Sequence, residues 1–176
     1  MTHTGRVFFG NLPHHNHRLQ NHRPLSPYAL LAAELGMTAS EVYGAVERAV
    51  AAQLAHRDGG GKATVMYAPL RLFIQHGARY CFPAPRGSLS RGVPTGYAAA
   101  PLKDLIVPGT DPVPVWPHRN GTVRGMALHP LYPSVPEAAL RNPALYELLV
   151  LFDAVRAGNA RERTLAIDLL EKRLQA

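Results

Sequence analysis

The residues best suited to chemistry in this chain are its histidines, its serines and a single cysteine. Five of the nine histidines fall within residues 1–25, where His14, His15 and His17 are close enough to share a divalent metal ion. A metal site also needs neighbouring groups that orient each imidazole, and this segment has no helical or alternating apolar period to supply them. We therefore predict a flexible His-rich arm over residues 1–25, with no metal site and no cofactor.

A nucleophile paired with a general base is the other reaction chemistry that these residue types allow. The candidates are Cys81, Ser88, Ser90, His76, His118 and His129. The chain has no Gly-rich phosphate loop with Lys-Ser/Thr, no His-Glu-x-x-His, no Gly-x-Ser-x-Gly and no close carboxylate pair. Cys81 alternates with Tyr80 and Phe82, which is typical of a strand that buries a small thiol. We expect a protein that is not an enzyme, unless the fold brings a nucleophile and a histidine together.

Basic side chains allow a different chemistry, the binding of anions. The formal net charge of +7 divides into +1 for residues 1–60, +6 for residues 61–144 and 0 for residues 145–176. Basic surface attracts polyanions by releasing condensed counterions, and nucleic acid is the commonest such partner. A solvated basic surface without a partner is the alternative interpretation.

Length and composition indicate the number of domains and the cellular compartment. A chain of 176 residues that is 47% hydrophobic suits one ordinary domain with a core and a smaller attached module. One cysteine excludes an internal disulfide and a zinc site of several thiolates, and it suits a reducing compartment. Since the first apolar run, Val7 to Phe9, is shorter than a signal peptide requires and no stretch could span a bilayer, we expect a cytoplasmic protein without a membrane partner.

Two capped helices are predicted over residues 26–54. Ser26 and Pro27 are typical of a helix start, and Gly36 can adopt the left-handed conformation that ends a helix. Between them lies an apolar face of Leu30, Leu31, Ala32 and Leu35. Thr38 and Glu41 have the spacing of a capping box, after which an apolar stripe continues to about Leu54. The pattern predicts a helix, a tight turn and a second helix.

The middle of the chain is rich in glycine and proline. After the glycines at residues 59–61 we predict a strand over residues 63–66, a helix from Pro69 to Gly77 and a strand over residues 78–82. A hairpin of residues 63–67 with residues 70–75 is the alternative. Eleven prolines between Pro83 and Pro136 exclude long helices, and Asn120-Gly121 predicts one hairpin with a type I′ turn. Trp116, Leu131 and Tyr132 are expected to pack this segment onto a core.

The C-terminus is predicted to be a helical hairpin. Asn142-Pro143 starts a helix that ends at Gly158, and Asn159 with Glu162 caps a second helix. Their apolar stripes are Leu145, Leu148, Leu149 and Phe152 on the first helix, and Leu165, Leu169, Leu170 and Leu174 on the second. We predict that the stripes pair two copies of the chain into a dimer. The alternative is a monomer in which Trp116, Leu128, Leu131 and Tyr132 cover both stripes.

Residues 28–47 resemble the helix-turn-helix of bacterial transcription regulators of the winged-helix kind, such as MarR-like and ArsR-like proteins. The resemblance rests on Leu31-Ala32 in the first helix, Leu35-Gly36-Met37 at the turn, and Val42, Ala45 and Val46 in the second helix. A looser resemblance, from His76-Gly77-Ala78-Arg79-Tyr80 to Ala157-Gly158-Asn159-Ala160-Arg161, is to bacterial proteins labelled MarR-like regulators. The apolar helix that usually precedes the pair is missing from residues 6–23. Either Val7, Phe8, Phe9 and Leu12 cover the core in another form, or the domain is trimmed.

The sequence patterns and the resemblance together predict an α+β, mostly helical fold in four parts. These are the arm (1–25), a winged-helix-like helix-turn-helix domain (26–83), an extended Pro/Gly-rich segment with a hairpin (84–141) and the helical hairpin (142–176).

The resemblance also implies that the second helix enters the major groove of DNA. Its outward positions are Thr38, Ala39, Ser40, Tyr43, Gly44 and Glu47, with Arg48 as the only cation on the helix. The outward positions lack the Arg, Lys, Asn or Gln that read bases most strongly. Phosphate contacts are therefore expected to carry most of the affinity, through Lys62, Arg79, Arg86 and Arg91.

The function implied is that of a transcriptional regulator that binds double-stranded DNA as a homodimer. The alternative is a protein-partner module, such as the antitoxin or regulatory half of a two-gene system, whose partner is encoded nearby.

Overall fold

The computed structural model describes residues 28–175. This part of the chain is α+β, about 53% helical, with seven α-helices and two small sheets among the described residues. The expected arm over residues 1–25 and the helix start at Ser26 and Pro27 lie outside the described residues.

The first two helices form as the sequence predicts. Helix α1 (Tyr28–Leu35) is followed by Gly36, whose φ of +64° is a left-handed conformation that a Cβ would strain. Helix α2 (Ala39–Ala51) begins after Thr38 and ends three residues before Leu54. The two helices share a small core of Ala32, Val42, Val46 and Ala63.

A β-hairpin follows α2. Strands β1 (Ala55–Arg57) and β2 (Ala63–Val65) pair antiparallel, which confirms the strand predicted at residue 63 and adds a partner that was not predicted. Helix α3 (Tyr67–His76) confirms the helix that ends at Gly77, although it begins before Pro69. The alternative hairpin of residues 63–67 with residues 70–75 is therefore wrong.

The strand predicted over residues 78–82 is wrong, because this segment forms the short helix α4 (Ala78–Cys81). The Phe82 amide donates to the Ala78 carbonyl at 2.9 Å, and Ala78 is fully buried. The Phe82 ring lies 6.2 Å from that of Phe73 and 6.1 Å from that of Phe152. Cys81 is exposed, so its interpretation as a core residue is also wrong. An alternation over five residues was too short to separate a strand from one helical turn.

The proline-rich middle forms a closed barrel of three short strands, β3 (Arg86–Pro94), β4 (Pro114–Pro117) and β5 (Val123–Leu128). Both β4 and β5 pair antiparallel with β3, and they pair parallel with each other.

The predicted hairpin at Asn120-Gly121 is therefore wrong. Neither residue has the positive φ that a type I′ turn requires. Pro117 and Val123 both pair with Gly92, so the loop between β4 and β5 crosses β3 at this point. A Cβ on Gly121 would lie 2.3 Å from the Gly92 Cα, and only glycine permits this approach.

Short helical turns attach the barrel to the remaining helices. They are the 3-10 turns η1 (Gly96–Ala98) and η2 (Leu102–Asp104) and the helix α5 (Val135–Arg141), which was not predicted. Pro136 fits the first turn of α5 because an amide there needs no partner within the helix. Trp116 is fully buried in a cluster with Val93 and Val150, and Tyr132 packs against it, which confirms that the middle segment packs on a core. The same expectation is wrong for Leu131, which is exposed.

The C-terminal helices α6 (Pro143–Ala157) and α7 (Ala160–Gln175) confirm the predicted helical hairpin. One side of α6 packs with α7 against Ile74 of α3 and Leu102 of η2. The other side packs against Trp116 and Val93 of the barrel. The apolar stripes are thus covered in large part by α3 and η2 as well as by the barrel, and self-association through them stays a prediction.

A buried polar cluster fixes α6 to the barrel. Asp153 is 2% exposed and accepts hydrogen bonds from Thr95 Oγ1 at 2.8 Å, Trp116 Nε1 at 2.6 Å and Arg156 Nε at 2.7 Å. Arg156 also donates to the His129 carbonyl at 2.6 Å. Burial raises the pKa of the Asp153 carboxyl, while the Arg156 charge and the donated hydrogen bonds oppose that rise.

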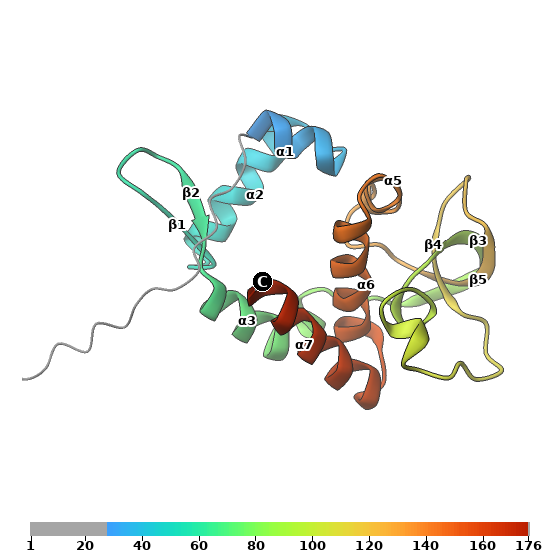
Figure 1. Cartoon of the computed structure of the whole chain (residues 1–176). Helices are drawn as coiled ribbons and strands as arrows, with labels where there is room; N and C mark the ends of the chain where they lie inside the picture. The colour runs from blue at the N-terminus through green and yellow to red at the C-terminus, as the bar shows by residue number, and fades with distance from the viewer. Residues whose placement is uncertain (1–27, 176) are drawn as a thin grey trace, which may run out of the picture.

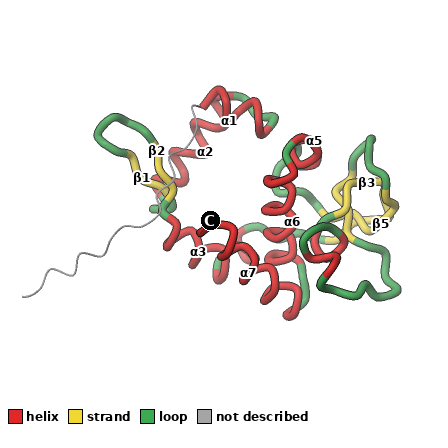
Figure 2. Tube along the Cα trace, in the orientation of Figure 1, coloured by secondary structure: helices red, strands yellow, loops and turns green. Residues whose placement is uncertain are grey.

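The helix pair and the barrel lie at opposite ends of the molecule, with α6 and α7 between them (Figure 1). Figure 2 shows that the strands are confined to the two ends, while the middle is helical. The Ser134 hydroxyl, beside α5, donates to the Leu35 carbonyl at 2.6 Å and so connects the first helix pair to the body.

Candidate nucleic-acid interface

The turn between α1 and α2 sets the direction of α2. The Met37 amide donates to the Ala32 carbonyl at 2.9 Å, which closes the turn. Thr38 Oγ1 accepts from the Glu41 amide at 3.2 Å, and the Glu41 carboxylate accepts from the Thr38 amide at 2.7 Å. This capping box satisfies two backbone groups at the start of α2 and occupies the Thr38 side chain.

The two sides of α2 differ in exposure. Val42 and Val46 are 1% and 5% exposed and face the core. The opposite side presents Ala39, Ser40 and Tyr43, all exposed. Of the other outward positions, Gly44 and Glu47 are partly buried and Arg48 is exposed. The face that the sequence assigned to base contacts is therefore accessible over the first turn of α2.

The charge of Glu47 is paired. Arg57 of β1 forms a salt bridge with Glu47, and its guanidinium donates to the Tyr28 hydroxyl at 2.9 Å. The same guanidinium lies 5.9 Å from the Tyr43 ring centre. The hydrogen bond to Glu47 is the main reason that the pKa of Arg57 is raised above its ordinary value. Through these contacts the outward side of α2 and the β1–β2 hairpin form one surface.

The hairpin loop carries the exposed Lys62. Asp58 Oδ1 accepts from the amides of Gly60 at 3.0 Å and Lys62 at 2.9 Å. These bonds hold the loop in a turn, so Lys62 is fixed at its backbone next to Arg57, which donates to the Gly61 carbonyl at 2.7 Å.

The start of α2 also contacts the segment that leads into α5. The Tyr132 hydroxyl donates to Glu41, and this bond is the main reason that the pKa of Glu41 falls to about 2. Because the pKa is lowered on folding, the stabilisation from this contact is present above the ordinary carboxyl range and is lost only as the pH falls toward 2. A guanidinium nitrogen of Arg141 would lie 3.2 Å from a Cβ at Gly36, so Arg141 is beside the turn.

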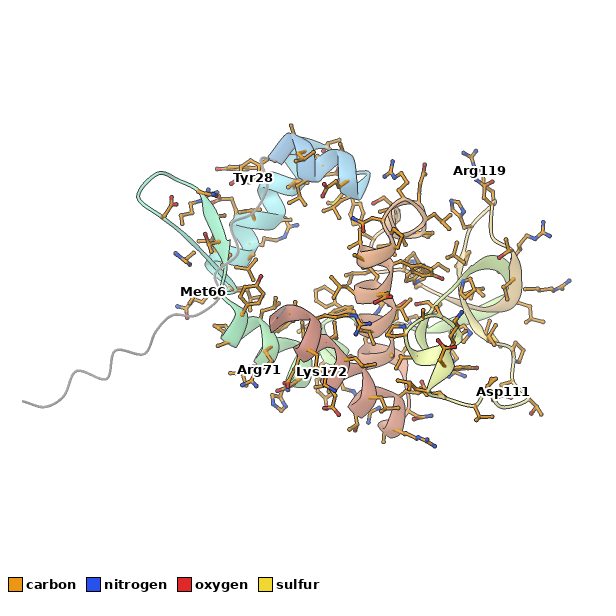
Figure 3. The ribbon with its side chains drawn as sticks, in the orientation of Figure 1. Tyr28, Met66, Arg71, Asp111, Arg119 and Lys172 are labelled. Atoms are coloured by element: carbon orange, nitrogen blue, oxygen red, sulfur yellow. The ribbon has the colours of Figure 1, made fainter. Side chains whose placement is uncertain are left out.

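The remaining predicted phosphate contacts lie elsewhere. Arg79 is exposed on α4, with its guanidinium 5.3 Å from the Tyr80 ring centre, and Arg86 and Arg91 are exposed on β3. Arg91 pairs in register with Arg124 of β5, so two like charges face each other across the strands. Figure 3 shows Tyr28 of α1 and Arg119 of the barrel at opposite sides of the molecule. The structure therefore brings Lys62 to α2 but places Arg86 and Arg91 on the separate barrel.

Formal charge is divided between the same two ends. Residues 28–66 hold three basic and four acidic residues, a net charge of −1. Residues 86–128 hold five basic and two acidic residues, a net charge of +3. None of the salt bridges between described residues involves the arginines of the barrel, Arg86, Arg91, Arg119 and Arg124.

Sequence reasoning missed Arg57 and Arg141. Each gains its position from a contact that is distant in the chain, with Tyr28 and with the Gly36 turn respectively. The basic character of the two residues was visible in the sequence, but no local pattern connected either one to α2.

The residues considered for catalysis and metal binding make other contacts. The Ser90 hydroxyl donates to the Arg91 carbonyl, and His118 Nδ1 accepts from the Asn120 amide. Within residues 28–175, neither Ser88, Ser90 nor Cys81 is hydrogen-bonded to His76, His118 or His129. The described part of the chain holds no group of three or more His, Cys, Asp or Glu that could bind a metal ion.

No protein-family model, no curated protein and no solved structure matches this chain. No helix in the described range has the length and apolar character needed to cross a membrane.

Proposed function

We propose that the protein is a transcriptional regulator of the winged-helix kind, which binds double-stranded DNA through α2 and the β1–β2 hairpin. The observation that carries the proposal is the exposed side of α2, with Ala39, Ser40 and Tyr43, joined through Arg57 to a hairpin whose loop carries the exposed Lys62. A helix, a turn, a helix and a two-stranded hairpin follow in this order. In such a domain the second helix enters the major groove.

Phosphate contacts supply most of the affinity in this proposal. The outward side of α2 offers no strong base reader, and residues 28–66 have a net charge of −1. In this proposal the positive field comes mainly from Lys62, from Arg141 beside the turn and from the arginines of the barrel. Binding of this kind is weakly dependent on sequence and strongly dependent on salt.

A dimer fits this function. One chain has one α2, and regulators with one reading helix per chain gain affinity when two-fold pairing places two such helices about one DNA turn apart. The half-buried leucines of α6 and α7 remain the proposed contact.

The experiment is a titration of fluorescently labelled duplex, about two helical turns long, at several salt concentrations. We expect the binding constant to fall steeply with salt, and the double variant Arg86→Ala, Arg91→Ala to weaken binding to every duplex by a similar factor. The control is Arg161→Ala, Lys172→Ala, which removes the same charge from exposed positions of α7. Binding that is insensitive to salt, or equal losses in the two double variants, would contradict the proposal that the charge of the barrel supports DNA binding.

A protein-partner module is the second candidate. It is favoured by exposed large side chains on α3, on α4 and just after α4, where Leu72 is 52%, Tyr80 74% and Phe82 40% exposed. Co-expression with the product of a neighbouring gene distinguishes the candidates. A stable complex that Tyr80→Ser dissociates, together with no DNA binding at low salt, would favour the partner module over the DNA-binding protein.

A further inference from the structure

An apolar groove lies on the inner side of the helix pair. It has a volume of about 250 Å³, and its lining includes Leu31 and Leu35 of α1, Ala45 and Ala49 of α2, and Leu54 and Leu70 beyond them. All the side chains that line it are apolar. A cavity of about 150 Å³ with such a lining holds a benzene ring, so this groove has room for a phenylalanine ring and part of a second side chain.

The groove exists because the elements around it do not close a core. The buried cluster of the helix pair contains only Ala32, Val42, Val46 and Ala63, which are small side chains. Two helices and a two-stranded hairpin cover one side of this cluster and leave Leu31 and Leu35 half-buried. Covering such surface is favourable by roughly 25 cal/mol for each Å² removed from water. A further apolar segment in the groove would therefore stabilise the domain.

We propose that Val7, Phe8 and Phe9 occupy this groove and complete the core of the helix pair. These three residues form the only run of consecutive large apolar side chains in the 27 residues that precede Tyr28. The groove has room for one phenylalanine ring of this run and part of a second side chain, and it offers no polar partner to a charged or hydrophilic segment.

The connection to α1 permits this docking. Tyr28 packs against the cluster that includes Val42 and Val46, and both valines also line the groove. Phe9 precedes Tyr28 by 19 residues, which can span up to about 60 Å. A covalent connection of this length gives an effective concentration near the millimolar range. The chain's own segment is therefore favoured over a second copy that is present at micromolar concentration.

The test measures how far a cysteine in the groove is protected from alkylation in the full chain. Cys81 is exposed and is first replaced by serine. The probe is Ala45→Cys in the groove, and the matched control is Ala51→Cys, an exposed position of α2 that does not line the groove. Both react with iodoacetamide, which is neutral, with and without the triple change Val7→Ser, Phe8→Ser, Phe9→Ser.

We expect Ala45→Cys to react about tenfold more slowly than Ala51→Cys, and the triple change to remove that difference. Equal rates at the two positions in the full chain, or protection that the triple change leaves intact, would overturn the proposal. Protection that disappears on dilution would assign the groove to a second copy. Ala49→Cys, also in the groove, replaces the first probe if Ala45→Cys unfolds the helix pair. The proposal does not depend on DNA binding, so it can fail or succeed separately.

Discussion

At the scale of single residues, the pairing of Glu47 changes how the outward side of α2 is interpreted. An unpaired carboxylate at this position would repel a phosphate backbone. The salt bridge with Arg57 balances that charge and also occupies a cation that could otherwise contact DNA. In the proposed DNA complex, the two residues therefore have opposite effects on affinity, although they belong to one ion pair.

The variants Glu47→Gln and Arg57→Gln test this pairing. Glu47→Gln should strengthen DNA binding several-fold, because it frees Arg57 to contact a phosphate. The slope of the logarithm of the binding constant against the logarithm of salt concentration should steepen by the amount expected for about one phosphate contact. Arg57→Gln should weaken binding because Glu47 is left unpaired. The measurement is the binding constant against salt concentration, with Asp168→Asn on the exposed side of α7 as the charge control. Weaker binding by Glu47→Gln would show that Arg57 does not face DNA.

The buried ion pair of Asp153 and Arg156 makes a second prediction at this scale. Asp153→Asn leaves the Arg156 guanidinium buried without its counter-charge, so we expect the free energy of unfolding to fall by about 3–5 kcal/mol. Urea denaturation followed by the fluorescence of Trp116, the chain's one tryptophan, measures the change. Asp168→Asn should change stability by less than about 0.5 kcal/mol. A similar small effect from Asp153→Asn would mean that the cluster does not fix α6 to the barrel.

At the scale of elements, the sequence predicts those helices and turns that depend on residues close together in the chain. The caps at Thr38 and Asn142 are local signals, and the helices that they begin were placed within a few residues. The exposure of Ala39 and Ser40 followed from the same apolar period. The barrel could not be predicted, because Gly92 pairs with both Pro117 and Val123 and no local pattern reports such pairing.

The crossing of the β4–β5 loop over β3 can be tested at Gly121. Gly121→Ala places a methyl group against the backbone of Gly92, so we expect a loss of about 2–3 kcal/mol or more in unfolding free energy. Gly109→Ala is the matched control, since a Cβ there meets no heavy atom within 4 Å. Urea denaturation followed by Trp116 fluorescence reports on both variants. Equal stability of the two variants would be incompatible with a loop that crosses β3 at this point.

At the scale of the whole molecule, α2 and the basic barrel lie at opposite ends and are joined by α5, α6 and α7 (Figure 1). The helix pair is attached to the body through Tyr132 and Ser134, which contact Glu41 and Leu35. A duplex that rests on α2 is therefore held by a surface with little charge of its own, and long-range attraction comes from the rest of the molecule. The other proposals about function depend on the position of α2 against DNA.

One measurement tests that position most directly, namely the DNA affinity of Ser40→Glu compared with that of Ala160→Glu. Both substitutions place a carboxylate at an exposed position in the first turn of a helix, where it stabilises the helix, so unfolding does not explain a loss of binding. We predict that Ser40→Glu weakens binding about tenfold or more, because its charge faces the duplex, and that Ala160→Glu changes it by less than about twofold. Equal, small effects of the two substitutions would contradict the claim that α2 binds DNA.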